Sequence, residues 1–149
     1  MSELQLDHEF FMRKALALAE QALLEGEIPI GALVVHNQTI LGKGYNQTER
    51  LMDVTAHAEM LAITAATNQL QAKYLHDCTL YVTIQPCVMC AGAIHHARIG
   101  TVVYGAYEPK TGCSMHLPTA FLEQKTKWIG GVMEMDCKQI LQQFFKSKR

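Results

Sequence analysis

The chain has 149 residues, enough for one ordinary domain with a buried core, and 49% of its residues are hydrophobic while 18% are charged. This balance excludes a largely disordered chain. A net charge of -1 argues against an extended surface that tracks nucleic-acid phosphates, although a few local cations could still contact RNA.

The first third of the sequence predicts a helix followed by a hairpin. Asp7 is suited to cap a helix that runs to about residue 25, and Gly26 is suited to end it. Residues 28–35 are apolar and rich in β-branched side chains, which indicates a strand. Asn37-Gln38 predicts a tight turn, after which residues 39–45 return as a second strand.

The rest of the chain alternates between helical and strand patterns. Thr55 is a candidate cap for a helix over residues 56–68, and Pro86 suits the first turn of a later helix that contains Cys87 and Cys90. Strands are predicted over 79–84, 99–106 and 128–133, and an amphipathic helix around 137–145. The stretch 107–127 fits no single pattern.

This alternation predicts an α/β fold with helices on both faces of a mixed sheet. No linker or repeat interrupts the sequence, so residues 1–149 are expected to form a single domain. The core is expected to contain apolar residues of the strands and helices: Leu33, Val35, Leu61, Leu80, Val82, Val102, Val103 and Phe144.

Five widely spread cysteines do not resemble a disulfide framework and suggest a reducing compartment, the cytoplasm, with thiols free for metal. The first seven residues lack the basic-then-apolar pattern of a signal peptide. No apolar run reaches the roughly 20 residues of a membrane span.

Four residues form the candidate reaction centre: His57, Glu59, Cys87 and Cys90. One imidazole and two thiolates are natural Zn²⁺ ligands, and three protein ligands leave the fourth tetrahedral position open for water. Zinc lowers the pKa of such a water to about 7. Glu59 is then the obvious general acid/base.

The spacing of His57 and Glu59 imposes a geometric condition. Residues two apart on a helix point roughly 200° apart, so these two side chains cannot share a lateral face. They can share a site only where the helix directs its N-terminus at the metal. We therefore predict that both motif helices point their N-terminal ends at the zinc.

Simpler interpretations compete with a catalytic zinc. A structural zinc site would have a fourth protein ligand, for which the other cysteines and two histidines are available: Cys78, Cys113, Cys137, His95 and His96. A pair of cysteines three apart can also be merely packed. The upstream His-x-Glu favours the catalytic interpretation, because this combination is the signature of zinc deaminases.

With these motifs the sequence resembles the cytidine/deoxycytidylate deaminase superfamily, and within it the bacterial tRNA-specific adenosine deaminases. The likeness covers nearly the whole chain. The zinc motif is common to the superfamily, and the flanking stretches narrow the resemblance to the enzymes that act on tRNA. The matching stretches are residues 26–32, 44–46, 55–59, 81–83, 86–94 and 98–99, together with a basic tail at 144–149.

The resemblance implies a three-layer α/β/α sandwich with a central five-stranded mixed sheet, a homodimer, and one zinc per chain held by His57, Cys87 and Cys90. Glu59 would be the acid/base in hydrolytic deamination of adenosine to inosine at the wobble position of a tRNA anticodon loop. Base binding would involve four further residues: Asn46, the backbone at Ala56, Ile30 and Ile84.

The sequence departs from the family pattern in four places, none of which is a zinc ligand. Gln85 replaces the usual Glu, Val54 the usual Pro and Glu108 the common Asp, while residues 113–127 look shorter and lack the usual Asn-His pair. The last two departures lie near where RNA would bind and so bear on the substrate. A deaminase of free guanine, cytosine or adenosine therefore remains an alternative, as does a noncatalytic RNA-binding subunit with structural zinc. Tyr107 and Phe145 could stack on nucleotides, and Lys110 and the cationic tail could contact phosphates or merely be solvated.

Overall fold

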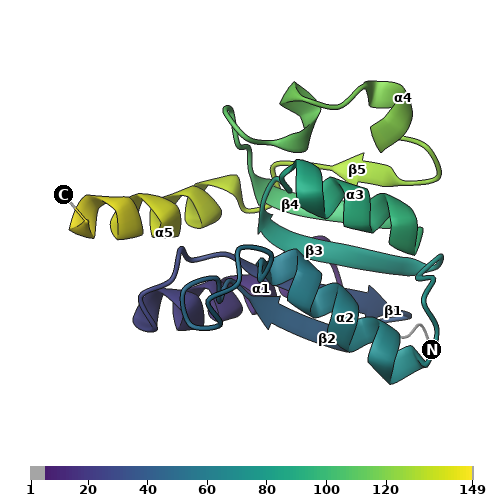
Figure 1. The fold of residues 1–149 in the computed structure, drawn as a ribbon, viewed down its shortest axis with the longest axis horizontal. Coiled ribbons are helices and arrows are strands. Elements are labelled where there is room, and N and C mark those ends of the chain that lie inside the picture. Colours follow the sequence, from purple (N-terminus) through teal and green to yellow (C-terminus); the bar gives the residue numbers. More distant parts are fainter. Residues whose placement is uncertain (1–5, 149) are drawn as a thin grey trace.

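A computed structural model describes residues 6–148 of the chain. Residues 1–5, which carry most of the signal-peptide expectation, and Arg149 of the predicted basic tail lie outside the described residues. Figure 1 shows the strands of one sheet with helices in front of it and behind it. The elements are α1 (His8–Leu24), β1 (Gly31–His36), β2 (Thr39–Tyr45), α2 (Ala58–Leu70), β3 (Cys78–Ile84), α3 (Val88–Ala97), β4 (Thr101–Ala106), a 3-10 turn (Cys113–Met115), α4 (Thr119–Leu122), β5 (Lys127–Ile129) and α5 (Glu134–Ser147).

The sheet has the strand order β2-β1-β3-β4-β5. β1 pairs antiparallel with β2 and with β3, whereas β3, β4 and β5 run parallel. Parallel neighbours need crossover connections, which α3 and the 107–126 segment supply. The predicted mixed five-stranded sheet with helices on both faces is therefore confirmed.

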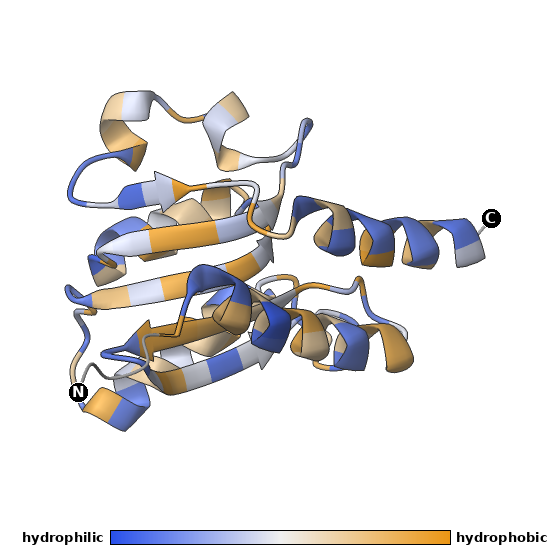
Figure 2. Cartoon of the chain, turned by 180° about the vertical axis from the view of Figure 1, so that it is seen from behind, coloured by the Kyte–Doolittle hydropathy of each residue, from blue (hydrophilic) through white to orange (hydrophobic). Residues whose placement is uncertain are grey.

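The two layers of core follow from strand alternation. Along β1, Ala32 and Val34 are buried against α2 and α3, whereas Leu33 and Val35 are buried against α1 and α5. Figure 2 shows hydrophobic segments along the central strands, whereas the helices carry both hydrophobic and hydrophilic residues along their length. Seven of the eight predicted core residues are buried; Leu61 is only half-buried, because alanines of α2 face the sheet.

Local sequence signals set the first helix and the hairpin. The Asp7 carboxylate accepts a hydrogen bond from the Phe10 N–H at 2.8 Å and caps α1, as predicted. Gly26, with φ of +79°, follows the helix end. Asn37 and Gln38 both have positive φ, the backbone form that suits a two-residue hairpin turn.

Several predicted boundaries are wrong. Thr55 does not cap α2, because its hydroxyl donates to Asp53; the cap position is His57. Pro86 lies before α3 rather than in its first turn, and its carbonyl accepts from Cys113 N–H.

Two predicted strands are shorter than expected. The first begins at Gly31 instead of residue 28, since Pro29 has no N–H to donate. β5 ends at Ile129, because Gly130 and Gly131 follow and Gly131 has a positive φ. Among the described helices, none combines the length and apolar character needed to cross a membrane.

Candidate metal and substrate site

Two helix N-termini bring together the three predicted metal ligands. His57 is the N-cap of α2 and Cys87 is the N-cap of α3, while Cys90 lies in the first turn of α3. The Nδ1 atom of His57 is 3.6 Å from the Cys87 sulfur and 3.5 Å from the Cys90 sulfur. The predicted end-on arrangement of both helices is therefore present.

These three donor atoms form a group that could hold a metal ion, since they all lie within 4.8 Å of one another. Neither cap side chain bonds to the start of its own helix, which leaves both free to act as ligands. Within residues 6–148, no fourth His, Cys, Asp or Glu belongs to this group. The alternative of a four-ligand structural site thus finds no support in the described residues.

The local electrostatics favour a thiolate beside the imidazole. A hydrogen bond from the Cys90 thiol lowers the pKa of Cys87 to about 4, and the bond with His57 acts in the same direction. The Cys87 sulfur in turn raises the pKa of His57. Glu59 is 3% exposed, and its desolvation raises the pKa of its carboxyl group to about 7.

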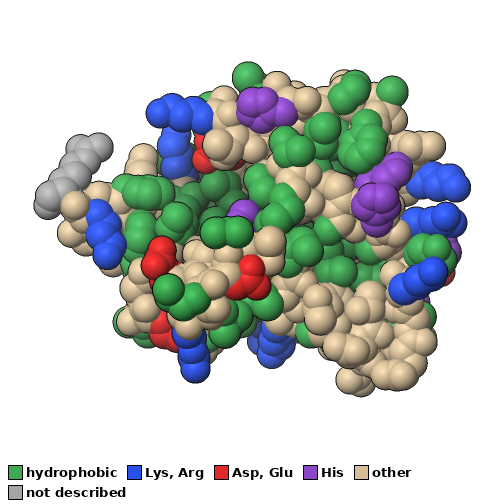
Figure 3. Space-filling view, in the orientation of Figure 1, with side chains coloured by type: hydrophobic (Ala, Val, Ile, Leu, Met, Phe, Trp, Pro, Cys, Tyr) green, Lys and Arg blue, Asp and Glu red, His purple; other side chains and the backbone are tan. Residues whose placement is uncertain are grey.

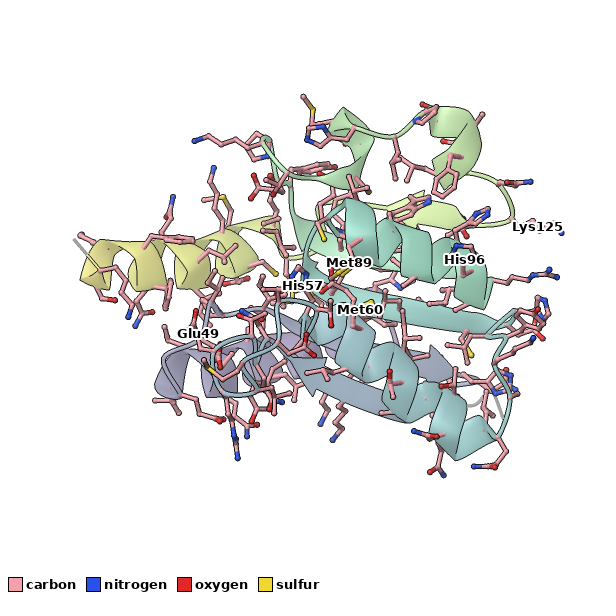
Figure 4. All side chains as sticks on the ribbon, in the orientation of Figure 1. Glu49, His57, Met60, Met89, His96 and Lys125 are labelled. Carbon is pink, nitrogen blue, oxygen red and sulfur yellow. The ribbon has the colours of Figure 1, made fainter. Side chains whose placement is uncertain are left out.

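A cavity of about 380 Å³ opens beside this group. His57, Cys87 and Glu59 line it, together with Ile30 and Ile84, two of the four residues predicted to contact a base. Figure 4 shows His57 near the middle of the molecule, between the starts of α2 and α3. The apolar walls and the buried carboxyl group suit a flat ring that carries polar edges.

Asn46 and Ala56, the other two predicted base contacts, are buried but do not line this cavity. The Asn46 amide donates to the Ile28 carbonyl at 3.3 Å and accepts from the Thr48 N–H at 3.4 Å. Ile28 lines the cavity, so Asn46 fixes part of its wall.

A buried carboxylate holds the loop that leads to His57. Glu27 is 1% exposed and accepts hydrogen bonds from the backbone N–H groups of Glu49 and Arg50, at 3.0 and 2.8 Å. Sequence reasoning missed this residue, because an acidic side chain before a strand has no distinctive pattern. The loop is thereby fixed from within the protein.

Gln85 connects the cavity to the 108–114 loop. Its amide donates to the Ser114 hydroxyl at 2.8 Å, and its carbonyl accepts from the Glu108 N–H at 3.3 Å. From the sequence, Gln85 was recognised only as a departure from the Glu that is usual in the family. Its position directly before Pro-Cys was the available signal that it lies at the site.

The last helix contributes a wall that the sequence did not predict. Lys138, Leu141 and Phe145 of α5 line the cavity opposite Tyr107. Their spacing of three and four residues puts them on one helix face. Phe145 and Tyr107 are each about half exposed, at 51% and 53%, so both present aromatic surface at the cavity mouth.

Comparison with known proteins agrees with this geometry. Residues 6–149 match the family model of the MafB19-like deaminases. The tRNA-specific adenosine deaminase of Aquifex aeolicus is 40% identical over 145 residues, which cover 95% of each chain. A solved tRNA:A34 deaminase, from work on A-to-I editing at the wobble position of transfer RNA, has a TM-score of 0.80 and 38% identity, covering 87% of this chain and 97% of its own.

A guanine deaminase from Bacillus subtilis is also similar, with a TM-score of 0.67 and 36% identity over 77% of this chain and 80% of its own. The matches to the tRNA-specific enzymes cover more of both compared chains and have a higher sequence identity. The chain therefore belongs to the tRNA-specific adenosine deaminase family, within the MafB19-like deaminases.

Proposed function

We propose that this protein hydrolyses adenosine to inosine at the wobble position of a tRNA anticodon loop. The observation that carries the proposal is the His57, Cys87 and Cys90 group beside the buried Glu59, in a chain 40% identical to tRNA-specific adenosine deaminases. A base in a single-stranded loop is easier to extrude into such a cavity than one in a duplex.

The donor geometry fits Zn²⁺. Tetrahedral zinc with Zn–S near 2.3 Å and Zn–N near 2.05 Å places nitrogen and sulfur ligands about 3.6 Å apart. The separations from His57 Nδ1 are 3.6 and 3.5 Å. When bound, zinc acts as a Lewis acid that lowers the pKa of a water molecule to about 7.

Glu59 is the proton carrier in this proposal. Its carboxyl group lines the cavity and is otherwise buried, so it faces the base-binding space and not bulk solvent. It takes a proton from the attacking water and delivers protons to the ring nitrogen and to the departing amine. Water adds at C6 of adenine, the C6–N bond breaks, and inosine and ammonia leave.

The cavity walls position the base. In this proposal Ile30 and Ile84 pack against its faces. Asn46 acts through Ile28, the cavity-wall residue whose carbonyl accepts its amide hydrogen bond. A contact of the base with the Ala56 backbone stays a prediction. Asn46→Ala is expected to raise KM more than it lowers kcat, because it removes binding and not the proton carrier.

The test is ammonia release from an anticodon stem-loop with adenosine at the wobble position, with inosine identified by nuclease digestion and mass spectrometry. Glu59→Gln should fold and bind zinc yet lose turnover by roughly a hundredfold or more. Parallel assays use free guanine, cytosine and adenosine. Turnover of free guanine without turnover of the stem-loop would replace our proposal by the activity of the Bacillus subtilis relative.

We further propose that residues 1–149 work as one domain, as a homodimer, in the cytoplasm. All five cysteines are free thiols, which suits a reducing compartment. Val88 is 40% exposed, Figure 3 shows hydrophobic side chains gathered on the face in view, and Figure 4 places Met60 and Met89 on that face. Exposed apolar patches often mark subunit contacts. Sedimentation velocity of the zinc-loaded protein tests the dimer.

A further inference from the structure

A small polar cavity lies at the opposite end of α3 from the metal group. Its volume is about 140 Å³, and its lining residues are His95, Arg98, Gln124 and Lys125. Every one of these side chains can donate hydrogen bonds, and none of them is acidic. Such a lining suits a single tetrahedral anion such as a phosphate group.

Two of the side chains that line this cavity, Arg98 and His95, contact aromatic rings. The Arg98 guanidinium lies 4.5 Å from the Tyr74 ring centroid, and the Lys73 ammonium lies 5.0 Å from it. The His95 ring stacks on Phe121 at 4.4 Å. Within residues 6–148, the two ion pairs involve Glu9 and Glu25, so no carboxylate lies within 4.0 Å of these cations.

The backbone places both cationic residues of the cavity where the chain turns. Arg98 has φ of +58° and Lys125 has φ of +65°, so both cationic residues of the cavity adopt the left-handed form that favours glycine or asparagine. Arg98 is the C-cap of α3, where a left-handed residue commonly ends a helix, so its backbone form sets where the side chain leaves the helix and is not a sign of strain.

The cavity lies far from the metal group, at the other end of α3. Ten residues of α3 separate it from Cys87, a length of about 15 Å along the helix axis. Figure 4 places His96 and Lys125 at the far end from His57, and Figure 3 shows cationic and histidine side chains together at that edge. A phosphate bound there would therefore belong to a nucleotide other than the one extruded into the metal-side cavity.

We propose that this cavity, which we call the α3-end cavity, binds a backbone phosphate of the RNA substrate outside the extruded nucleotide. The inference rests on the proposed function. It also explains how a chain with a net charge of -1 binds RNA, since the cations required are local.

The test compares wild type with Lys125→Gln, and with Lys43→Gln as the control, because Lys43 is an exposed lysine on β2. Binding of the inosine-containing product stem-loop is followed by fluorescence anisotropy between about 50 and 200 mM KCl. Lys125→Gln should weaken binding about threefold to tenfold and lower the salt slope by about one, while kcat at saturating RNA is unchanged. Lys43→Gln should match wild type.

Equal affinity and equal salt slope in wild type and Lys125→Gln would overturn the inference, as would loss of the dimer in this variant. Inorganic phosphate is titrated separately against the His95 ring signals by NMR. A response to phosphate with unchanged RNA binding assigns the cavity to a free anion and also overturns the inference. If wild type neither binds nor deaminates the stem-loop, the proposed function itself fails, which is a separate outcome.

Discussion

Replacing Gly44 by alanine tests how the sheet positions the metal ligands. A Cβ atom at this position of β2 would lie 2.4 Å from the Ala58 carbonyl oxygen and 2.7 Å from the Ala62 nitrogen. Both are backbone atoms of α2, so no flexible side chain can yield. The first contact is about 1 Å shorter than ordinary van der Waals contact, and α2 must therefore move by about that distance.

The displacement has two expected consequences. Overpacking of this kind costs about 1–3 kcal/mol in the free energy of unfolding. Ala58 directly follows His57, so the same movement carries the imidazole away from the two sulfurs, whereas zinc tolerates distance errors of only about 0.2 Å. We expect zinc affinity to fall about 10-fold to 100-fold, the range seen when ligand orientation is lost.

Urea unfolding of the metal-free protein gives the first quantity, and competition with a chromogenic chelator gives the second. Lys43→Ala is the matched control, because it changes the adjacent residue of the same strand at an exposed position and should stay within about 0.5 kcal/mol of wild type. A Gly44→Ala protein with wild-type stability and wild-type zinc affinity would refute the link between β2 packing and ligand position.

Further predictions concern the cap of α1, the buried phenol of Tyr81 and the bound zinc. Asp7→Ala removes the cap of α1 and should cost about 1 kcal/mol in urea unfolding, whereas Asp7→Asn should recover most of it; equal losses in both variants would show that the cap is not the cause. Burial raises the pKa of Tyr81 to about 12, above the unfolded value near 10, so its contribution is complete below pH 10 and is lost as the pH rises through 12. Tyr81→Phe should lose less stability than wild type between pH 9 and 12, by roughly 2 kcal/mol, and parallel pH profiles would contradict this. Removal of zinc by a chelator should lower Tm, with full recovery on adding zinc, because a ligand bound only by the folded state stabilises it; an unchanged Tm would argue against a bound metal.

The sequence predicted the elements that depend on local patterns. The α1 cap at Asp7, the Asn37-Gln38 turn and the alternation of β1 all required only neighbouring residues. The end-on approach of α2 could also be predicted, because two residues two apart on a helix cannot face one ligand from its side.

The features that the sequence did not predict depend on contacts between segments that are distant in the chain. Thr55 looks like a cap, but its hydroxyl bonds to Asp53, so α2 begins two residues later. The wall from Leu141 and Phe145 requires α5 to pass the end of the sheet, which no local pattern specifies. Gln85 is likewise recognisable as a link between segments only once Ser114 is beside it.

The place of α5 has a practical consequence for anyone who handles this protein. Phe145, at the cavity mouth, lies in the last turn of α5 (Glu134–Ser147). A bulky label attached within one turn of Phe145 would stand beside the entrance and compete with incoming RNA. Labels are better attached at an exposed position of β2 such as Lys43, and activity lost on labelling α5 should return when the label is cleaved off.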